Sequence, residues 1–406
     1  MEATKNFFEF IRRHANDDVN ALRLKYAGKG NRDIDFEMEF ALIQIEARRK
    51  TRKKLPSFLS HPEFVFPTLL SAEQASNEAV ARLHASLISS SSRLLDLTAG
   101  LGVDDISFAK KGINVTACEI DYNKCEALQH NSKVMGVSDK LSIVYGDSIG
   151  FVRDSKEQFD VVFADPARRN DSGGKLHALS DCQPDILAAM HDILSISPRL
   201  LVKSSPLLDL SLIRNTVSDL KHIYVVCYKG ECKEVLIDIQ KGAKYEGVTV
   251  VDIDMEGEIS RFHTEFSTAE SKSKVSMCDR KKAEEYKYLY EPNAGIMKTS
   301  AWSTLIAKYQ DLRKADTNTH IFLSDTLYSD FPGRVMQILS EPDKKALKAL
   351  KGTKINIVAR NHPLSAPQIT NKYSLMTGSD KFLYAFRYRN IPTFLVVSPI
   401  STDKTT

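Results

Sequence analysis

The sequence lacks features that several large protein classes require. Its 406 residues contain no run of about 18 apolar residues, and the first residues have no apolar core of signal-peptide length. The six cysteines form no Cys-x-x-Cys pair, and the histidines show no metal-ligand spacing. We therefore predict a protein with no metal and no membrane association, with reduced cysteines, in the cytoplasm.

The sequence also lacks a strong net charge and the motifs of several enzyme classes. The formal net charge of +4 is small, so a nucleic-acid surface would have to come from local clusters. The Gly-Gly-Lys at 173–175 is followed by Leu176, where a phosphate loop needs Ser or Thr. No Gly-x-Ser-x-Gly motif or Cys–His pair suggests a hydrolase. The sequence therefore disfavours ATP binding, and it disfavours hydrolase activity.

The central feature is a predicted strand that leads through a glycine turn into a helix. The apolar run at 94–97 forms the strand, and Gly100 and Gly102 permit a sharp turn. Asp104 and Asp105 are expected to cap the helix. A dinucleotide-binding turn needs a third glycine where this chain has Asp105, whose charge would face a pyrophosphate. A ligand with adenosine, an amino-acid tail and no phosphate, such as S-adenosylmethionine (SAM), suits this turn better.

Strand and helix patterns alternate from residue 93 to about 239. The expected strands are 93–98, 114–120, 141–145, 159–164 and 200–203, and the expected helices are 105–111, 122–135, 148–154, 184–194 and 208–220. A hairpin of strands 223–228 and 231–239 follows, which puts one antiparallel strand at the sheet edge. The pattern predicts an α/β fold with a doubly wound, Rossmann-like, mostly parallel seven-stranded sheet.

The regions on either side of this sheet differ in composition. An N-terminal helical region is predicted over 1–70, and its basic run at 48–54 either complements a helix dipole or contacts phosphates. Ser71 has capping-box spacing and is expected to begin a helix that leads into the first strand. After residue 240, small α+β domains are predicted. Tyrosines at 286–290 alternate with other residues near lysines, which suits either an RNA surface or a core strand.

Four motifs lie at the carboxyl ends of predicted strands, where ligands bind in open α/β sheets. They are Asp96-Leu-Thr-Ala-Gly-Leu-Gly102, Ala117-Cys-Glu-Ile-Asp121, Gly146-Asp-Ser148 and Asp165-Pro-Ala-Arg-Arg-Asn170. Over residues 70–240 these motifs resemble class I SAM-dependent methyltransferases, with Thr98 in place of the first glycine of the family's turn.

The resemblance implies a set of cofactor contacts. Glu119 would accept hydrogen bonds from both ribose hydroxyls and Asp147 would accept one from the adenine amino group. The alternative for Glu119 and Asp147 is helix capping. The remaining expected cofactor residues are Asp96, Thr98, Gly100, Gly102, Asp104, Ile120 and Ser148.

The fourth motif resembles the Asp/Asn-Pro-Pro-aromatic motif of enzymes that methylate amino nitrogens of bases. Asp165 and the Pro166 carbonyl would align the acceptor, and Arg168 stands where the family stacks an aromatic ring on a base. This substitution leaves the acceptor atom open. Arg169 and Lys203 are expected to contact substrate, and the alternative for these cations is an ordinary surface role.

The C-terminal part is similar to the THUMP-like domain that follows certain bacterial methyltransferases, preceded by a ferredoxin-like segment. The expected domains are 1–70, 71–240 (methyltransferase), 241–323 (connecting ferredoxin-like segment) and 324–400 (THUMP-like). The resemblance implies an RNA substrate, tRNA or rRNA. The hypothesis is a SAM-dependent RNA methyltransferase. Methylation of DNA or protein, or a catalytically silent RNA-binding protein, remain alternatives, and the oligomeric state is left open.

Overall fold

The computed structural model describes residues 4–26, 35–168, 182–265 and 275–400. Contacts within the chain divide it into two compact units. The N-terminal unit comprises residues 1–224 and 234–246, and the C-terminal unit comprises residues 225–233 and 247–406. Within the described residues, no helix combines the length and apolarity needed to cross a membrane.

The chain begins with the helices predicted for its first 70 residues: α1 (Lys5–Arg13), α2 (Val19–Tyr26), α3 (Met38–Thr51) and α4 (Pro56–Leu59). Thr4 caps α1 by accepting a hydrogen bond from the Phe7 N–H. Phe7 and Ile11 stand one helical turn apart and pack with Leu42 and Ile45 of α3 in a small core. Apolar side chains spaced one helical turn apart therefore pack α1 against α3.

The basic run at the end of α3 is largely occupied by contacts within the protein. Arg48 donates to the carbonyl oxygens of Pro62 and Phe64, Arg49 to that of Ala15, Lys50 pairs with the Glu73 carboxylate, and Lys54 donates to the Glu73 carbonyl. Burial lowers the pKa of Arg48 to about 10. For these four cations the structure favours a structural role over phosphate contact.

Two short helices, not one, lead into the first strand. The α5 helix (Leu69–Gln74) is capped by Thr68, whose hydroxyl accepts the Ser71 N–H at 3.0 Å. The α6 helix (Glu78–Ser86) is capped by Asn77. The expected start at Ser71 is therefore wrong, because Thr68 provides the cap one turn earlier and the chain is extended at Ala75.

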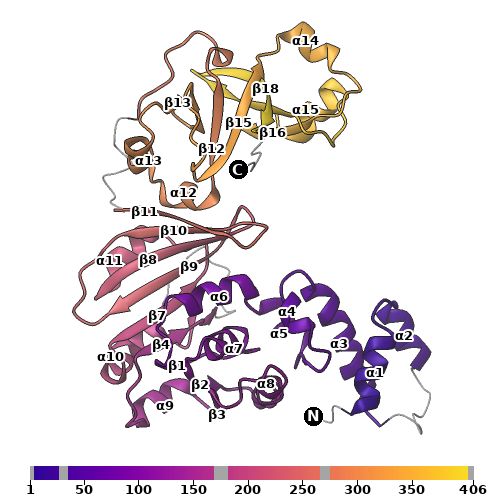
Figure 1. The fold of residues 1–406 in the computed structure, drawn as a ribbon, viewed down its shortest axis with the longest axis vertical. Helices are drawn as coiled ribbons and strands as arrows, with labels where there is room; N and C mark the ends of the chain where they lie inside the picture. The colour runs from indigo at the N-terminus through magenta and orange to yellow at the C-terminus, as the bar shows by residue number, and fades with distance from the viewer. Residues whose placement is uncertain (1–3, 27–34, 169–181, 266–274, 401–406) are drawn as a thin grey trace, which may run out of the picture. The chain divides into compact units, whose positions relative to one another are not determined.

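The predicted α/β sheet follows (Figure 1). Its strands are β1 (Arg93–Asp96), β2 (Asn114–Glu119), β3 (Leu141–Tyr145), β4 (Val161–Ala164), β7 (Arg199–Ser204), β8 (Leu220–Tyr228) and β9 (Glu231–Gln240). These strands belong to a sheet of nine strands, two more than predicted, in which their order is β8-β9-β7-β4-β1-β2-β3. The five strands from β7 to β3 are parallel, and β9 runs antiparallel to β7. The sheet is therefore mixed, as the hairpin predicted.

Helices cover both faces of this sheet. They are α7 (Val103–Lys110), α8 (Tyr122–Val134), α9 (Ser148–Asp154), α10 (Ile186–Ile196) and α11 (Leu210–Thr216). Figure 1 shows α7 and α8 on one side of the strands and α9 and α10 on the other. The core lies between sheet and helices, where Leu94, Phe108 and Leu128 are fully buried. Most predicted boundaries are confirmed within two residues, but α11 is shorter because Asp209 caps it and Val217 is extended.

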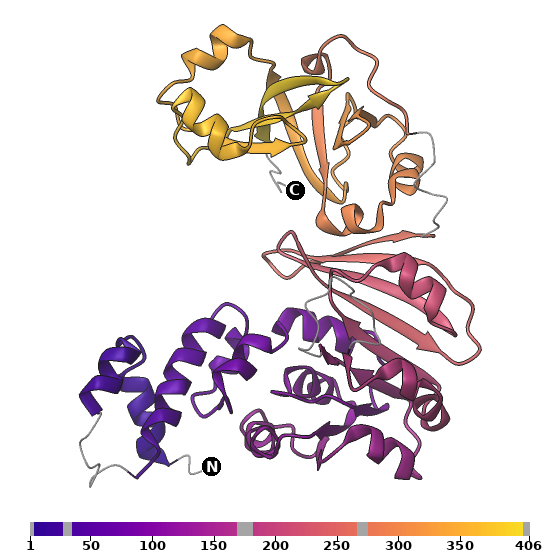
Figure 2. The same ribbon diagram turned by 180° about the vertical axis from the view of Figure 1, so that it is seen from behind.

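The C-terminal unit contains an antiparallel pair, β10 (Val248–Ile253) and β11 (Ile259–Thr264), and a separate seven-stranded sheet (Figure 2). The strands of that sheet are β12 (Tyr288–Pro292), β13 (Arg313–Asp316), β14 (Thr319–Ser324), β15 (Gly333–Ser340), β16 (Asn356–Arg360), β17 (Phe382–Tyr388) and β18 (Ile391–Pro399). Their order is β13-β14-β12-β15-β18-β17-β16. Its helices are α12 (Ala294–Thr299), α13 (Trp302–Lys308), α14 (Lys344–Ala349) and α15 (Ala366–Tyr373).

The tyrosines at the start of this sheet belong to its core. Tyr286 and Tyr290 are buried, and their hydroxyls donate to Asp279 and to the Thr326 carbonyl. Of the two roles left open for this segment, the structure favours the core strand. Four of the five residues of β12 are buried, so this strand lies inside the sheet's core.

Candidate active site

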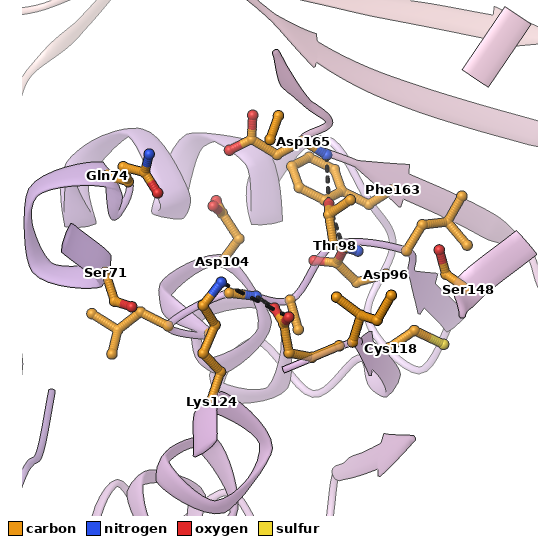
Figure 3. A pocket seen from close by; sticks show the side chains of 18 of the residues that line it. Ser71, Gln74, Asp96, Thr98, Asp104, Cys118, Lys124, Ser148, Phe163 and Asp165 are labelled. Atoms are coloured by element: carbon orange, nitrogen blue, oxygen red, sulfur yellow. Dashed lines mark hydrogen bonds and ion pairs between the residues drawn. The ribbon is translucent and has the colours of Figure 1, made fainter. Parts of the chain in front are cut away.

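A pocket of about 360 Å³ opens at the carboxyl ends of β1, β2 and β4 (Figure 3). Its lining includes every residue expected to bind the cofactor: Asp96, Thr98, Gly100, Gly102, Asp104, Glu119, Ile120, Asp147 and Ser148. Asp165 lines the same pocket. A parallel sheet with helices on both faces brings these loops together, although the residues span about seventy positions of sequence.

The glycine turn closes one side of the pocket. Gly100 and Gly102 have φ values of 58° and 80°, in the left-handed region that glycine tolerates. A Cβ at Gly102 would lie 2.1 Å from Cδ1 of Leu128, so any other residue would force the buried Leu128 side chain to move. Gly102 is also the N-cap of α7. The expectation that Asp104 and Asp105 cap this helix is wrong, because both lie in its first turn and are buried.

Glu119 ends β2 at the base of the pocket and is 8% exposed. One carboxylate oxygen accepts the Gly100 N–H and the other accepts the Asp121 N–H, each at 2.9 Å. Lys124 Nζ lies 3.9 Å from the carboxylate. Because each carboxylate oxygen can accept more than one hydrogen bond, Glu119 can hold the glycine turn and still accept hydroxyl donors from a ligand.

Asp147 lines the pocket and also caps α9. Its two oxygens accept the N–H groups of Ile149 at 3.3 Å and Gly150 at 2.9 Å. The side chain stays exposed, so its remaining lone pairs are open to the pocket. The capping alternative given for this residue therefore holds, and it is compatible with ligand contact.

Thr98 links two strand ends. Its hydroxyl accepts the Asp165 N–H at 2.7 Å and donates to Asp96 Oδ1 at 3.2 Å (Figure 3). Thr98 therefore fixes the backbone of the residue expected to meet the acceptor. Desolvation raises the pKa of Asp96 to about 7, and it raises the pKa of the neighbouring Asp105 carboxyl, together with the charge of Asp96.

An ion pair stands at the end of β4. Lys203 Nζ lies 2.5 Å from Asp165 Oδ2 and donates to Ser76 Oγ at 2.9 Å. The Lys203 side chain is 13% exposed and does not line the pocket, whereas the Asp165 side chain is 39% exposed. Desolvation raises the pKa of Asp165, and the Lys203 charge opposes that rise. Lys203 was expected to contact substrate. In the structure its ammonium forms an ion pair with the Asp165 carboxylate.

Sequence reasoning missed His84, which links this ion pair to the glycine turn. The ring is fully buried, with Nδ1 2.7 Å from Asp104 and Nε2 2.5 Å from Glu234. Burial would lower the pKa of His84, but the two carboxylates outweigh burial and raise it to about 10. Ser76 Oγ donates to Asp104 as well, so one polar network joins His84 to Asp165 through Ser76 and Lys203. A single histidine in an amphipathic helix gave no signal of this role.

The other residues expected near the acceptor are Pro166, Arg168 and Arg169. Pro166 does not line the pocket, although Ala167 beside it does. Arg168 forms with Ala167 the short strand β5 (Ala167–Arg168), which pairs with β6 (Cys182–Gln183). The side chain of Arg168, and the whole of Arg169, lie outside the described residues. Within the described residues, no group of three or more metal-binding side chains occurs.

Comparison with known proteins adds two family matches. Residues 91–174 match the RNA cap guanine-N2 methyltransferase family, and residues 288–332 match a ferredoxin-like domain. No curated protein matches the sequence. The ferredoxin-like match falls within the sheet of the C-terminal unit and overlaps the segment expected to have that fold.

Similar solved structures include a proposed methyltransferase from Porphyromonas gingivalis W83, with 24% identity, a TM-score of 0.81 and 98% coverage of each chain. TrmK from M. capricolum, solved with S-adenosylhomocysteine, has 15% identity and a TM-score of 0.30, covering 41% of this chain and 70% of its own. A proposed RNA methyltransferase from Pyrococcus horikoshii has 17% identity and a TM-score of 0.28, covering 38% and 74%. Of these three structures, the first covers almost the whole of this chain, and the other two cover less than half of it.

The family match at 91–174 covers the glycine turn, Glu119, Asp147 and Asp165, the residues that the fold gathers around one pocket. Among the residues that the structure describes, the lining contains acidic acceptors for hydroxyl and amino donors and no phosphate-binding lysine loop. These features fit adenosine joined to an amino acid. The N-terminal unit therefore carries a SAM-dependent methyltransferase domain.

Proposed function

We propose that the protein methylates RNA, with a base amino group as the acceptor. The observation that carries the proposal is the Asp165 carboxylate, which lines the pocket with its side chain 39% exposed while Oδ2 pairs with Lys203. A carboxylate fixed in this way can accept a hydrogen bond from an amine and orient its lone pair. The description of the matched family, RNA cap guanine-N2 methyltransferase, supports both an RNA substrate and a nitrogen acceptor.

The roles proposed for the cofactor residues follow from their contacts. Glu119 accepts the ribose hydroxyls while it holds the Gly100 N–H, and Asp147 accepts the adenine amino group while it caps α9. SAM, when bound, supplies a methyl group already activated by its sulfonium. The protein's task is then mainly alignment, because little acid–base chemistry is needed before transfer.

On the acceptor side, Asp165 takes one amine hydrogen in this proposal, and the Pro166 carbonyl, between the lining residues Asp165 and Ala167, takes the other. After transfer the methylated amine carries an extra proton, and the Asp165 carboxylate can accept it. The raised pKa of Asp165 favours that step, since a more basic carboxylate is a better proton acceptor. Arg168 and Arg169 are proposed to contact the base or a phosphate of the RNA.

We also propose that residues 324–400 act as a THUMP-like RNA-binding domain, that the substrate is a structured RNA such as tRNA or rRNA, and that the compartment is the cytoplasm. The six cysteines support a reducing compartment, since all lie in described residues as free thiols. The whole-chain charge of +4 gives no strong preference for RNA, so the substrate must be tested directly.

The test compares modified nucleosides, by mass spectrometry, in RNA from cells with and without the protein. We expect one methylated base to disappear without the protein and to return when purified protein and SAM are added to that RNA. Asp165→Ala protein should bind SAM but fail to restore the base. Methyl transfer to DNA or protein but not to RNA would contradict the proposal, as would SAM binding without transfer to any acceptor.

A further inference from the structure

The C-terminal unit has a pocket of its own, of about 430 Å³. Its walls come from β10, β12, α12, the turn before β14, the start of β15 and the end of β16. The polar residues that line it are Asp252, Glu291, Asn293, Asn318, His320, Arg334, Arg360 and Asn361. A cavity of this size with convergent polar groups is typical of a small-ligand site.

Two arginines line this pocket, and both contact Glu291. Arg360 Nε donates to Glu291 Oε1 at 2.6 Å, and Arg334 Nη1 lies 3.8 Å from Glu291 Oε2. Glu291 is buried and also accepts the Tyr384 hydroxyl at 2.8 Å. The Glu291 carboxylate thus contacts both guanidinium groups. The side chain of Arg360 stays 52% exposed and that of Arg334 stays 64% exposed. Because a guanidinium has five N–H donors, both can still bind an anion, and a phosphate suits their fork geometry.

A carboxylate from another strand provides acceptors in the same pocket. Asp252 Oδ2 accepts from Asn293 Nδ2 at 2.9 Å, and burial raises the pKa of Asp252. The other Asp252 oxygen can take a hydroxyl or amino donor. The pocket therefore offers arginine N–H groups to an anion and a carboxylate oxygen to a hydroxyl or amino group. A simple anion such as phosphate would use only the arginines.

His320 adds an aromatic ring with an unsatisfied atom. The ring lines the pocket and stacks on Trp302, with centroids 4.8 Å apart and planes 7° apart. Its Nδ1 is buried and has no hydrogen-bond partner among the described residues. Burial and the Lys314 charge lower the pKa of His320, so the ring is neutral and can both donate and accept. A buried nitrogen left without a partner is costly, and the ring that carries it lines this pocket.

We propose that this pocket binds a nucleoside monophosphate unit, either a free nucleotide or the phosphorylated end of an RNA. The phosphate binds Arg334 and Arg360, the ribose or base donors bind Asp252, and the base contacts His320. The proposal does not depend on methyl transfer, because every residue involved belongs to the C-terminal unit.

The chain offers a direct readout, since Trp302 is its single tryptophan and stacks on His320. Full-length protein is titrated with adenosine 5′-monophosphate, adenosine and inorganic phosphate, followed by Trp302 fluorescence and calorimetry. We expect saturable binding of the monophosphate, at least tenfold tighter than adenosine or phosphate alone. No saturable binding of the monophosphate, or equal binding of inorganic phosphate, would overturn the proposal.

Charge-neutral variants locate the site. Arg334→Gln and Arg360→Gln should each weaken monophosphate binding at least tenfold and leave adenosine binding unchanged. The matched control is Arg261→Gln, because Arg261 is exposed on β11 and does not line the pocket. Equal affinity in the control and in both pocket variants would contradict the assignment. Should a variant misfold, the wild-type titrations still decide the proposal.

Competition identifies the source of the nucleotide. A short RNA with a 5′-phosphate that displaces the monophosphate, while the same RNA with a 5′-hydroxyl does not, assigns the pocket to an RNA end. Displacement by neither RNA, with the monophosphate bound, assigns it to a free nucleotide. In both arms, SAM binding at the N-terminal unit is measured alongside, so failure here is distinguishable from failure of the methyltransferase proposal.

Discussion

Lys203 Nζ lies 2.5 Å from Asp165 Oδ2, so a cation from β7 holds one oxygen of the carboxylate that ends β4. The Asp165 side chain also lines the pocket and is 39% exposed, so its other oxygen can still accept a hydrogen bond. The two residues meet because β4 and β7 are adjacent parallel strands whose carboxyl ends stand side by side. Lys203 is thus a positioning residue that acts through Asp165.

We predict that Lys203→Met lowers methyl transfer about 100-fold, because a misplaced acceptor contact costs about that much. SAM affinity should change little, since Lys203 does not line the pocket. The measurement is kcat and KM with RNA from cells that lack the protein, beside SAM calorimetry. Lys221→Met, whose ammonium contacts Gln240, is the control.

The same variant should change the pH dependence. Lys203 opposes the rise in the pKa of Asp165, so its removal raises that pKa further. Transfer requires the carboxylate, which is protonated as the pH falls. The acidic limb of kcat/KM should therefore move to higher pH in Lys203→Met, and partly return in Lys203→Arg. An unmoved limb would reject the positioning role.

His84 should govern stability more than chemistry. Replacing it with Gln leaves Asp104 and Glu234 buried without their shared cation, which costs about 3–5 kcal/mol of unfolding free energy. The folded pKa of His84, about 10, lies above its ordinary value of 6.5. Its contribution is therefore fully present below pH about 6.5 and is lost as the pH rises through about 10.

The measurement for His84 is urea unfolding of wild type and His84→Gln from pH 6 to 10. The difference in unfolding free energy between them should shrink as the pH rises. His191→Gln, at a side chain 97% exposed, is the control and should match wild type throughout. A pH-independent difference would show that His84 is not held as a cation.

Gly102 and Gly112 give a matched pair of glycines. Both have positive φ, 80° and 92°, but a Cβ at Gly102 would meet Leu128 at 2.1 Å, whereas one at Gly112 would meet nothing within 4 Å. Alanine should cost roughly 1–2 kcal/mol at either position from backbone strain, and about 1–3 kcal/mol more at Gly102 from overpacking.

Denaturant unfolding of the two alanine variants tests this difference. In a double-mutant cycle, Leu128→Ala should recover part of the extra loss at Gly102, because the clash is removed. Equal losses at Gly102 and Gly112, or no coupling with Leu128, would contradict the steric explanation.

Local sequence pattern predicted the parallel strands because each combines an apolar run with a turn at its end. It also predicted that the residues expected to bind the cofactor lie together, since motifs at the ends of adjacent parallel strands must meet. It failed where partners are distant in sequence. His84 and Glu234 are 150 residues apart, and nothing local to either indicates the other. The cap of α7 was misplaced because Asp104 faces His84 in the interior and Gly102 supplies the turn.

Glu119 provides the last prediction, because it has two tasks at once. Glu119→Gln can keep one acceptor for the Gly100 N–H, so the fold should survive, but it loses the charge that strengthens bonds to ribose hydroxyls. We expect SAM affinity to fall about 10- to 100-fold, as the loss of one or two charge-assisted bonds implies. Calorimetry with SAM and S-adenosylhomocysteine measures this, with Glu126→Gln on α8, outside the pocket lining, as control. Affinity within twofold of wild type would mean that Glu119 only braces the glycine turn.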